Sequence, residues 1–197
     1  MADVLQQLRA GTATEHADVE RTLDLLDAAL DRSRLVDVLD RLHAFWASAE
    51  EGLDAWAERH PADARAVDWS RRRRAALFAE DLRALDATGV RARPELPPVE
   101  GTDQALGRLY VLEGSTLGGT FIDRHLASLP QLSDVRVRAF SPYGSETGAM
   151  WAGFRRVTRH RVAAGGDPDA MVAAARDTFR ALARWCGPVA VGEVVPA

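Results

Sequence analysis

The sequence predicts an all-α fold in a single domain, and three observations support this prediction. Apolar residues recur at three- and four-residue steps along most of the chain, no alternating strand pattern lasts beyond a few residues, and glycine or proline signals separate six helical segments. The chain has 197 residues, 47% of them hydrophobic and 27% charged. A single domain of this size, expected to cover residues 1–187, can enclose a ligand in its core.

The first half of the chain contains three of the expected helices. The first spans residues 4–23 with Asp3 as its N-cap, the second spans residues 33–59, and the third spans residues 69–88. In the third helix the run Arg71–Arg74 lies opposite the apolar residues. We therefore expect these four arginines on a solvated face.

The second half contains the other three helices. Thr102 or Asp103 can cap the fourth helix, and Asp167 followed by proline is a typical start for the last one. The expected helices span residues 102–128, 145–165 and 168–186. A flexible tail is expected at residues 188–197.

Charge and composition exclude several classes of function. The formal net charge of −4 argues against a general attraction to nucleic acid or to acidic membranes. The single cysteine, Cys186, excludes an internal disulfide and a metal site made of several thiolates. No signal peptide and no apolar run of about 20 residues is present, so we expect a cytoplasmic protein without a membrane segment.

One histidine of the first helix has the spacing of a metal ligand. Thr12, His16 and Glu20 lie one turn apart on one face of that helix, which is expected to turn toward the core. Glu20 can accept the proton of one imidazole nitrogen and leave the other nitrogen free to bind a metal. The same spacing is also typical of an ordinary surface pair, so the pattern alone leaves both interpretations open.

The fourth helix contains three glycines within YVLEGSTLGGTF, residues 110–121. Gly114, Gly118 and Gly119 each cost a helix about 1 kcal/mol relative to alanine. They can allow the backbone to approach a flat ligand, or they can allow two helices to pack closely. A phosphate-binding loop is excluded because the segment lacks the GxxxxGK[ST] pattern and no strand precedes it.

Three blocks, taken together, resemble the bacterial heme oxygenases. They are LRAGTATEHADVE near the start, YVLEGSTLGGTFIDRHL in the middle, and FSPYGSETGAMWAGFRRV followed by RDTFRALARW. The similarity is strongest to the form that supplies biliverdin to bacterial phytochromes, and it spans nearly the whole chain in the same order. It implies a single-domain heme oxygenase-like fold.

The resemblance also implies the activity. Heme b would be both cofactor and substrate, and O2 with reducing electrons would convert it to biliverdin, carbon monoxide and ferrous iron. The electrons would come from a donor such as ferredoxin or ferredoxin reductase, and Arg71–Arg74 could dock an acidic donor. Whether a bacteriophytochrome receives the biliverdin stays open. The alternative is a heme carrier or sensor of the same fold that does not degrade the ring.

The resemblance assigns iron coordination to the first helix and the oxygen-binding side to the fourth. His16 stands at the position of the proximal iron ligand, and Glu20 at that of the carboxylate that orients it. The segment Gly114–Gly119 corresponds to the kinked distal helix, which lies over the other face of heme. Gly114, Ser115, Gly118 and Gly119 are therefore the candidate catalytic positions.

Ser115 departs from the pattern of mammalian members, which carry an aspartate there to hold water molecules. Protons could be organised by Ser115, by backbone near Gly114 or by a more distant side chain acting through water, with Asp123 or Arg124 as weaker candidates.

The heme propionates require cations or hydroxyl groups at the mouth of the pocket. The candidates are Arg9, Arg156 and the Tyr110 hydroxyl. Both arginines also fit a solvated helix face.

Overall fold

The computed structural model describes residues 3–89 and 92–187, which form helices and connecting segments without a strand. The prediction of an all-α fold is confirmed. The α-helices are α1 (Val4–Gly11), α2 (Ala13–Leu23), α3 (Arg32–Arg59), α4 (Pro61–Ala66), α5 (Ala75–Ala84), α6 (Thr102–Ser128), α7 (Thr147–Ala163) and α8 (Pro168–Cys186). The 3-10 turns are η1 (Trp69–Arg71), η2 (Pro130–Leu132) and η3 (Gly144–Glu146). The tail expected at residues 188–197 lies outside the described residues.

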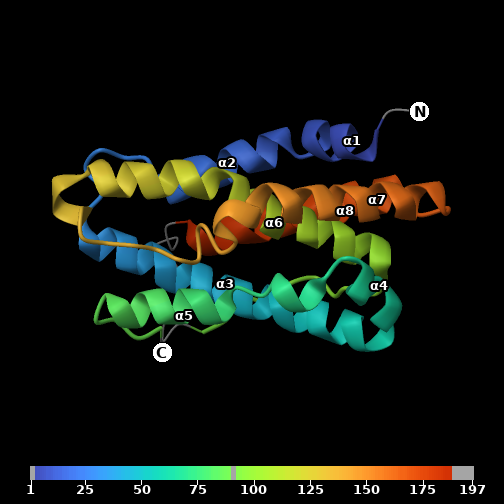
Figure 1. The fold of residues 1–197 in the computed structure, drawn as a ribbon, viewed down its shortest axis with the longest axis horizontal. Coiled ribbons are helices and arrows are strands. Elements are labelled where there is room, and N and C mark those ends of the chain that lie inside the picture. Colours follow the sequence, from blue (N-terminus) through green and yellow to red (C-terminus); the bar gives the residue numbers. More distant parts are fainter. Residues whose placement is uncertain (1–2, 90–91, 188–197) are drawn as a thin grey trace, which may run out of the picture.

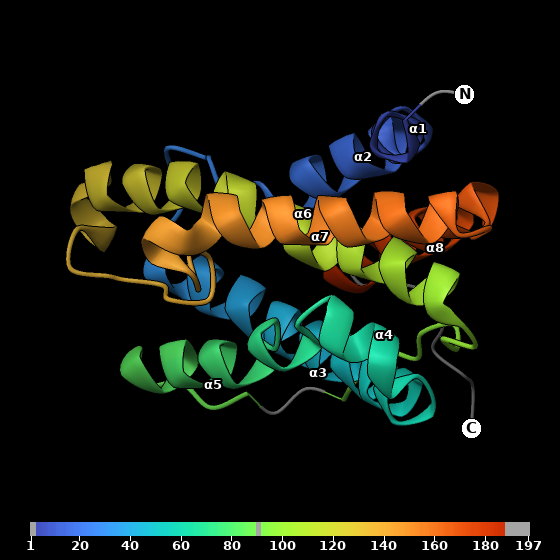
Figure 2. The same ribbon diagram turned by 45° about the vertical axis from the view of Figure 1, so that its right-hand side comes forward.

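The helices form three layers (Figures 1 and 2). Helices α1 and α2 form one outer layer, α6, α7 and α8 form the middle layer, and α3, α4 and α5 form the other outer layer. Helix α8 packs against α6 and also against α1, α2 and α3, so it joins all three layers. Among the helices of residues 3–89 and 92–187, none combines the length and the apolar character that a membrane span requires.

Two of the expected N-caps are present. The side chain of Asp3 accepts a hydrogen bond from the backbone N–H of Leu5 at 3.4 Å, and that of Asp167 accepts one from Ala170 at 3.1 Å. The expected cap of α6 is wrong, because Gly101 occupies the cap position without a side-chain bond. The carboxylate of Asp103 instead pairs with Arg161 at 2.8 Å and ties the start of α6 to α7.

The single helix expected over residues 4–23 is wrong, because the chain breaks at Thr12. Thr12 has φ −117° and ψ 6°, and its hydroxyl donates a hydrogen bond to the Leu8 carbonyl at 2.7 Å. A hydroxyl bound in this way competes with the helical hydrogen bonds and bends the chain. At the neighbouring Gly11, an added Cβ would lie 2.7 Å from a methyl of Val172 in α8. As a result, α1 and α2 are two separate helices that do not share an axis.

The helix expected over residues 69–88 is also wrong. The chain forms η1 and then turns before α5 begins at Ala75. The turn carries Arg72 and Arg74 into the interior, where they are only 3% and 1% exposed. The interpretation of the arginine run as a solvated face therefore holds for Arg71 and Arg73 but is wrong for the other two.

Candidate functional site

His16 lies on α2 in a setting that leaves much of its ring exposed. Its Nδ1 atom is 3.4 Å from Oε2 of Glu20, and the two side chains are 55% and 68% exposed. The ring also meets the edge of Phe179 in α8, with 5.5 Å between the ring centroids. Within the described ranges, Nε2 makes no hydrogen bond. The expected turn of this face toward the core is only partly observed, because the imidazole contacts α8 but stays largely open.

The three glycines of α6 lie in two different environments. A Cβ atom added at Gly114 or Gly118 would meet no atom within 4 Å. A Cβ added at Gly119 would overlap the carbonyl oxygen of Phe140. The close-packing interpretation therefore applies to Gly119, while Gly114 and Gly118 border open space.

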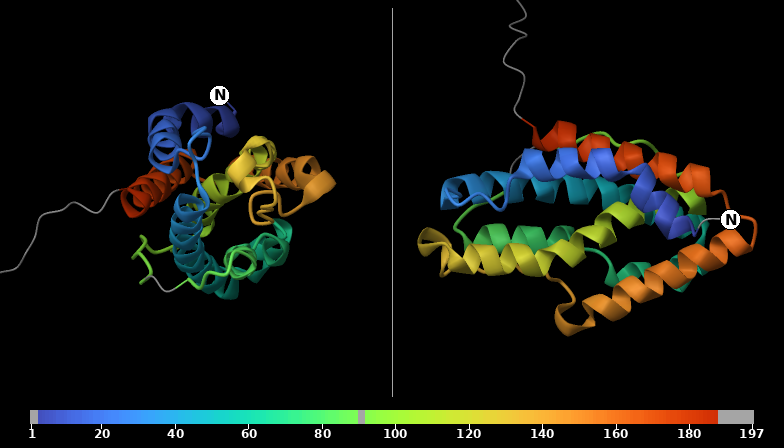
Figure 3. Two further views of the ribbon diagram at one scale, coloured as in Figure 1. Left: turned by 90° about the vertical axis from the view of Figure 1, so that its left-hand side faces the viewer. Right: turned by 90° about the horizontal axis from the view of Figure 1, so that it is seen from above.

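The open part of α6 is also apolar. Leu117 is 41% exposed and Phe121 is 66% exposed, although both are large hydrophobic residues. They lie one turn apart, beside Gly114 and Gly118 on the helix. Figures 2 and 3 show that α6 bends near its middle. This segment offers a flat apolar ligand both clearance and contact.

Tyr110 links α6 to the junction of α1 and α2. The Thr12 side chain and the Arg9 charge both influence its hydroxyl. Burial raises the pKa of Tyr110, while the Thr12 side chain and the Arg9 charge partly counteract that rise. Arg9 therefore lies within electrostatic reach of Tyr110, which precedes Gly114 by one helical turn. Arg156 lies on the exposed side of α7, and no contact in the described residues joins it to these two.

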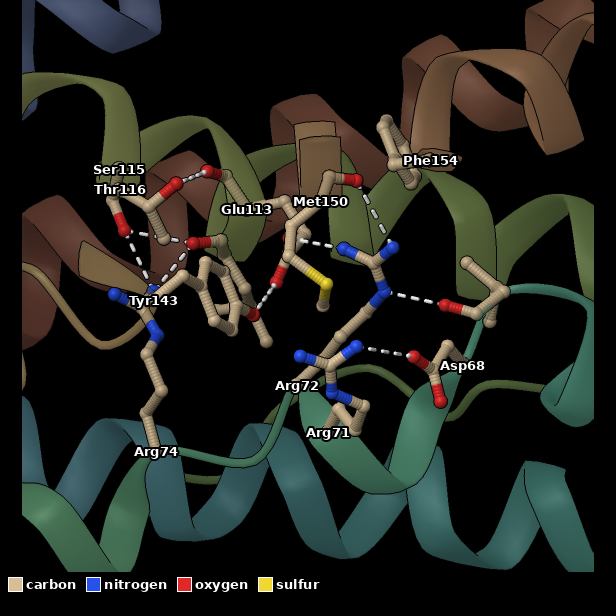
Figure 4. Close-up of polar contacts among 12 residues, drawn as sticks. Asp68, Arg71, Arg72, Arg74, Glu113, Ser115, Thr116, Tyr143, Met150 and Phe154 are labelled. Atoms are coloured by element: carbon tan, nitrogen blue, oxygen red, sulfur yellow. Dashed lines mark hydrogen bonds and ion pairs between the residues drawn. The ribbon is translucent and has the colours of Figure 1, made fainter. Parts of the chain in front are cut away.

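A buried polar network lies behind the glycine segment, and the sequence did not indicate it (Figure 4). Arg72 forms an ion pair with Glu113, and these side chains are only 2% and 1% exposed. The Tyr143 hydroxyl donates a hydrogen bond to Oε1 of Glu113 at 2.7 Å. Burial and the Glu113 charge both raise the pKa of Tyr143, so its hydroxyl stays a donor. The one signal available in the sequence was Glu113, a carboxylate within an otherwise apolar part of α6.

Ser115 is held from behind by Arg74. The Nη2 atom of Arg74 donates to Oγ of Ser115 at 2.7 Å, and Ser115 donates to the Leu112 carbonyl at the same distance. The guanidinium also lies over the ring of Trp46, 4.9 Å from its centroid. Because a hydroxyl has one proton and two lone pairs, Ser115 keeps one lone pair with which to accept a further hydrogen bond.

The two weaker distal candidates lie further along α6. The carboxylate of Asp123 accepts a hydrogen bond from the Ser141 hydroxyl, and burial raises its pKa. Arg124 is exposed. Neither contacts the network around Glu113 and Ser115 within the described part of the chain.

The chain is similar to known proteins over most of its length. A family model described as heme oxygenase matches residues 2–187. A protein named heme oxygenase from Xanthomonas campestris is 32% identical over 133 residues, which are 68% of this chain and 76% of that protein.

Two solved structures share the fold. One is the heme oxygenase from Neisseria meningitidis in NO- and CO-bound forms, with TM-score 0.75 and 21% identity over 98% of this chain and 96% of that chain. The other is a heme oxygenase from the cyanobacterium Synechocystis in complex with heme, with TM-score 0.69 and 15% identity over 94% of this chain and 91% of that chain.

Proposed function

The chain belongs to the heme oxygenase family, and from this premise we propose that it cleaves heme with O2 and reducing electrons to biliverdin, carbon monoxide and ferrous iron. Bound heme supplies the iron at which O2 is reduced and the porphyrin ring that is opened. The protein supplies a ligand to the iron, a surface for the ring and a fixed arrangement of polar groups.

The residues of α2 fit the role of iron ligand. Glu20, beside Nδ1 of His16, keeps the proton on that nitrogen and leaves the lone pair of Nε2 for the iron. Phe179 supports one edge of the imidazole. A neutral imidazole donates less electron density than a thiolate, which suits oxidation of the ring itself.

The residues of α6 fit the opposite face of heme. The open space at Gly114 and Gly118 can admit the ring and a small bound molecule, and Leu117 and Phe121 can cover it with apolar surface. Ser115 can accept a hydrogen bond from a water molecule, as an aspartate at this position would, because Arg74 fixes the position of its hydroxyl.

The polar groups at the edge of the proposed heme site fit the propionates of heme. Arg9 lies within electrostatic reach of Tyr110 near the α1–α2 junction, and the two side chains can bind one propionate together. Arg156 is exposed on α7 and remains a separate candidate for the second propionate.

Electrons would come from a ferredoxin or a ferredoxin reductase. The exposed members of the arginine run, Arg71 and Arg73, already pair with Glu146 and Asp54. This pairing partly neutralises the two arginines and disfavours donor docking at that run.

The observation that carries the proposal is the pairing of His16 with Glu20 in a chain whose glycine segment borders open space. The test is to add hemin to the purified protein and then to supply ascorbate, or ferredoxin with its reductase, in air. We expect the Soret band to disappear while the absorption of biliverdin grows. A stable ferrous or oxygenated spectrum would instead identify a carrier or sensor.

A further inference from the structure

Arg108 is a buried cation without a counter-charge. Its side chain lies on α6, is 4% exposed, and donates one hydrogen bond to the Pro97 carbonyl. Its Nε atom is buried without a partner, and no carboxylate pairs with it among residues 3–89 and 92–187. Burial lowers the pKa of Arg108 to about 10, so the guanidinium stays protonated at neutral pH.

The other buried arginines are better compensated. Arg72 pairs with Glu113, and Arg74, whose Nε atom is also buried without a partner, donates to Ser115 and to two backbone carbonyls. A buried charge that lacks such partners destabilises the folded state, because its lost hydration is not replaced. An anion beside Arg108 would recover much of this cost.

Arg108 lines a cavity that can hold such an anion. The cavity has a volume of about 280 Å³ and lies between the segment around Pro98, the N-terminal half of α6 and the first turns of α8. Its walls are largely apolar, with Ala170, Ala173 and Ala174 contributed by α8. Gln104 and Thr178 add neutral polar groups.

We propose that this cavity binds a small carboxylate with one negative charge and an apolar body, with Arg108 as its counter-ion. A planar guanidinium matches a carboxylate in shape, and the alanine wall suits an aliphatic or aromatic group. Asp177 also lines the cavity, where Arg180 at 3.8 Å partly balances its charge, and it disfavours a second negative charge on the ligand. The volume limits the ligand to less than drug size.

This site is separate from the proposed heme site. Arg108 precedes Gly114 by six residues, which is about 9 Å along a helix axis. None of the glycines of α6 lines the cavity, and neither does His16. The inference therefore does not depend on the proposed function, and it can fail or hold independently of heme cleavage.

The experiment is isothermal titration calorimetry of the purified protein with three probes, which are pentanoate, its neutral analogue pentanamide, and inorganic phosphate. We expect saturable binding of pentanoate and at least tenfold weaker binding of the other two. Arg108→Gln should weaken pentanoate binding at least tenfold, because it removes a charge-assisted hydrogen bond. Arg184→Gln, which changes an exposed arginine of α8, should leave it unchanged.

A second variant separates binding from folding. Ala173→Leu adds bulk to the cavity wall, leaves Arg108 in place, and should also weaken pentanoate binding. The thermal midpoint of Arg108→Gln without ligand should not fall below that of the wild type, because an uncompensated buried charge is removed. Equal binding of pentanoate and pentanamide, a preference for phosphate, or unchanged pentanoate affinity in both variants would overturn the proposal.

Discussion

The two sides of the proposed heme site are built differently. On α2, His16 and Glu20 are both more than half exposed and meet through one contact of 3.4 Å. Behind α6, Arg72 and Glu113 are almost fully buried, and Tyr143 completes their network. One side can therefore adjust its position when a ligand arrives, while the other is already fixed.

This difference shows that the α6 side of the site is the rigid one. A ligand bond to iron tolerates some movement of an exposed imidazole, whereas orienting a reaction requires polar groups that are held in place beforehand. We interpret the network of Arg72, Glu113 and Tyr143 as the support that fixes the glycine segment of α6. Four substitutions test this contrast, ordered by their expected effect on the free energy of unfolding.

The largest effect is expected for Glu113→Gln. This change leaves Arg72 buried without its counter-charge and should lower the free energy of unfolding by about 3–5 kcal/mol. Urea denaturation followed by circular dichroism measures it. The matched control is Arg71→Gln, which breaks the exposed pair with Glu146 and should change the free energy of unfolding much less. If the two variants lost a similar amount of unfolding free energy, the α6 side of the site would not be rigid.

Gly119→Ala should have the next largest effect. The added methyl group would overlap the Phe140 carbonyl, so the backbone must shift at a cost of about 1–3 kcal/mol. The same denaturation experiment tests this expectation. An unchanged midpoint would show that α6 and the segment around Phe140 separate easily.

Gly118→Ala should act in the opposite direction. The methyl group meets no atom within 4 Å, and alanine favours a helix by about 1 kcal/mol, so the heme-free protein should become more stable. The variant should also bind hemin more weakly, because the methyl group fills space needed by the ring. A hemin titration followed at the Soret band measures the second effect, and unchanged affinity would place the ring elsewhere.

His16→Ala should change stability least. Its side chain is more than half exposed, so the free energy of unfolding should stay within about 0.5 kcal/mol of the wild type. The Soret spectrum of the hemin complex should nevertheless change, because the iron loses its protein ligand. If the spectrum stays as in the wild type, another residue is the ligand.

Local patterns of the sequence predicted much of the fold. The apolar periodicity and the end signals located α3, α6 and α8 within one residue at each end, because these helices depend on residues close in the chain. The break at Thr12 was missed, since it also depends on the approach of Val172 from α8. Contacts of that kind join residues far apart in the sequence and leave no periodic signal.

The candidate site was predicted unevenly for the same reason. The pair of His16 and Glu20 follows from helical spacing, and the structure has it. The burial of Arg72 and Arg74 was not predictable, because arginine in a charged run usually faces solvent and their partners lie about 40 positions away. The glycine pattern suggested both close packing and clearance, but only the neighbouring Phe140 distinguishes Gly119 from the other two.

The contrast among these glycines also determines which positions of α6 can change during evolution. Gly119 serves the fold, so a descendant of this chain would lose stability by replacing it even after losing its ligand. Gly114 and Gly118 weaken the helix without any packing need, so only selection for a ligand would retain them. A lineage that abandoned the ligand would be expected to acquire alanine at positions 114 and 118, gain stability, and keep glycine at 119.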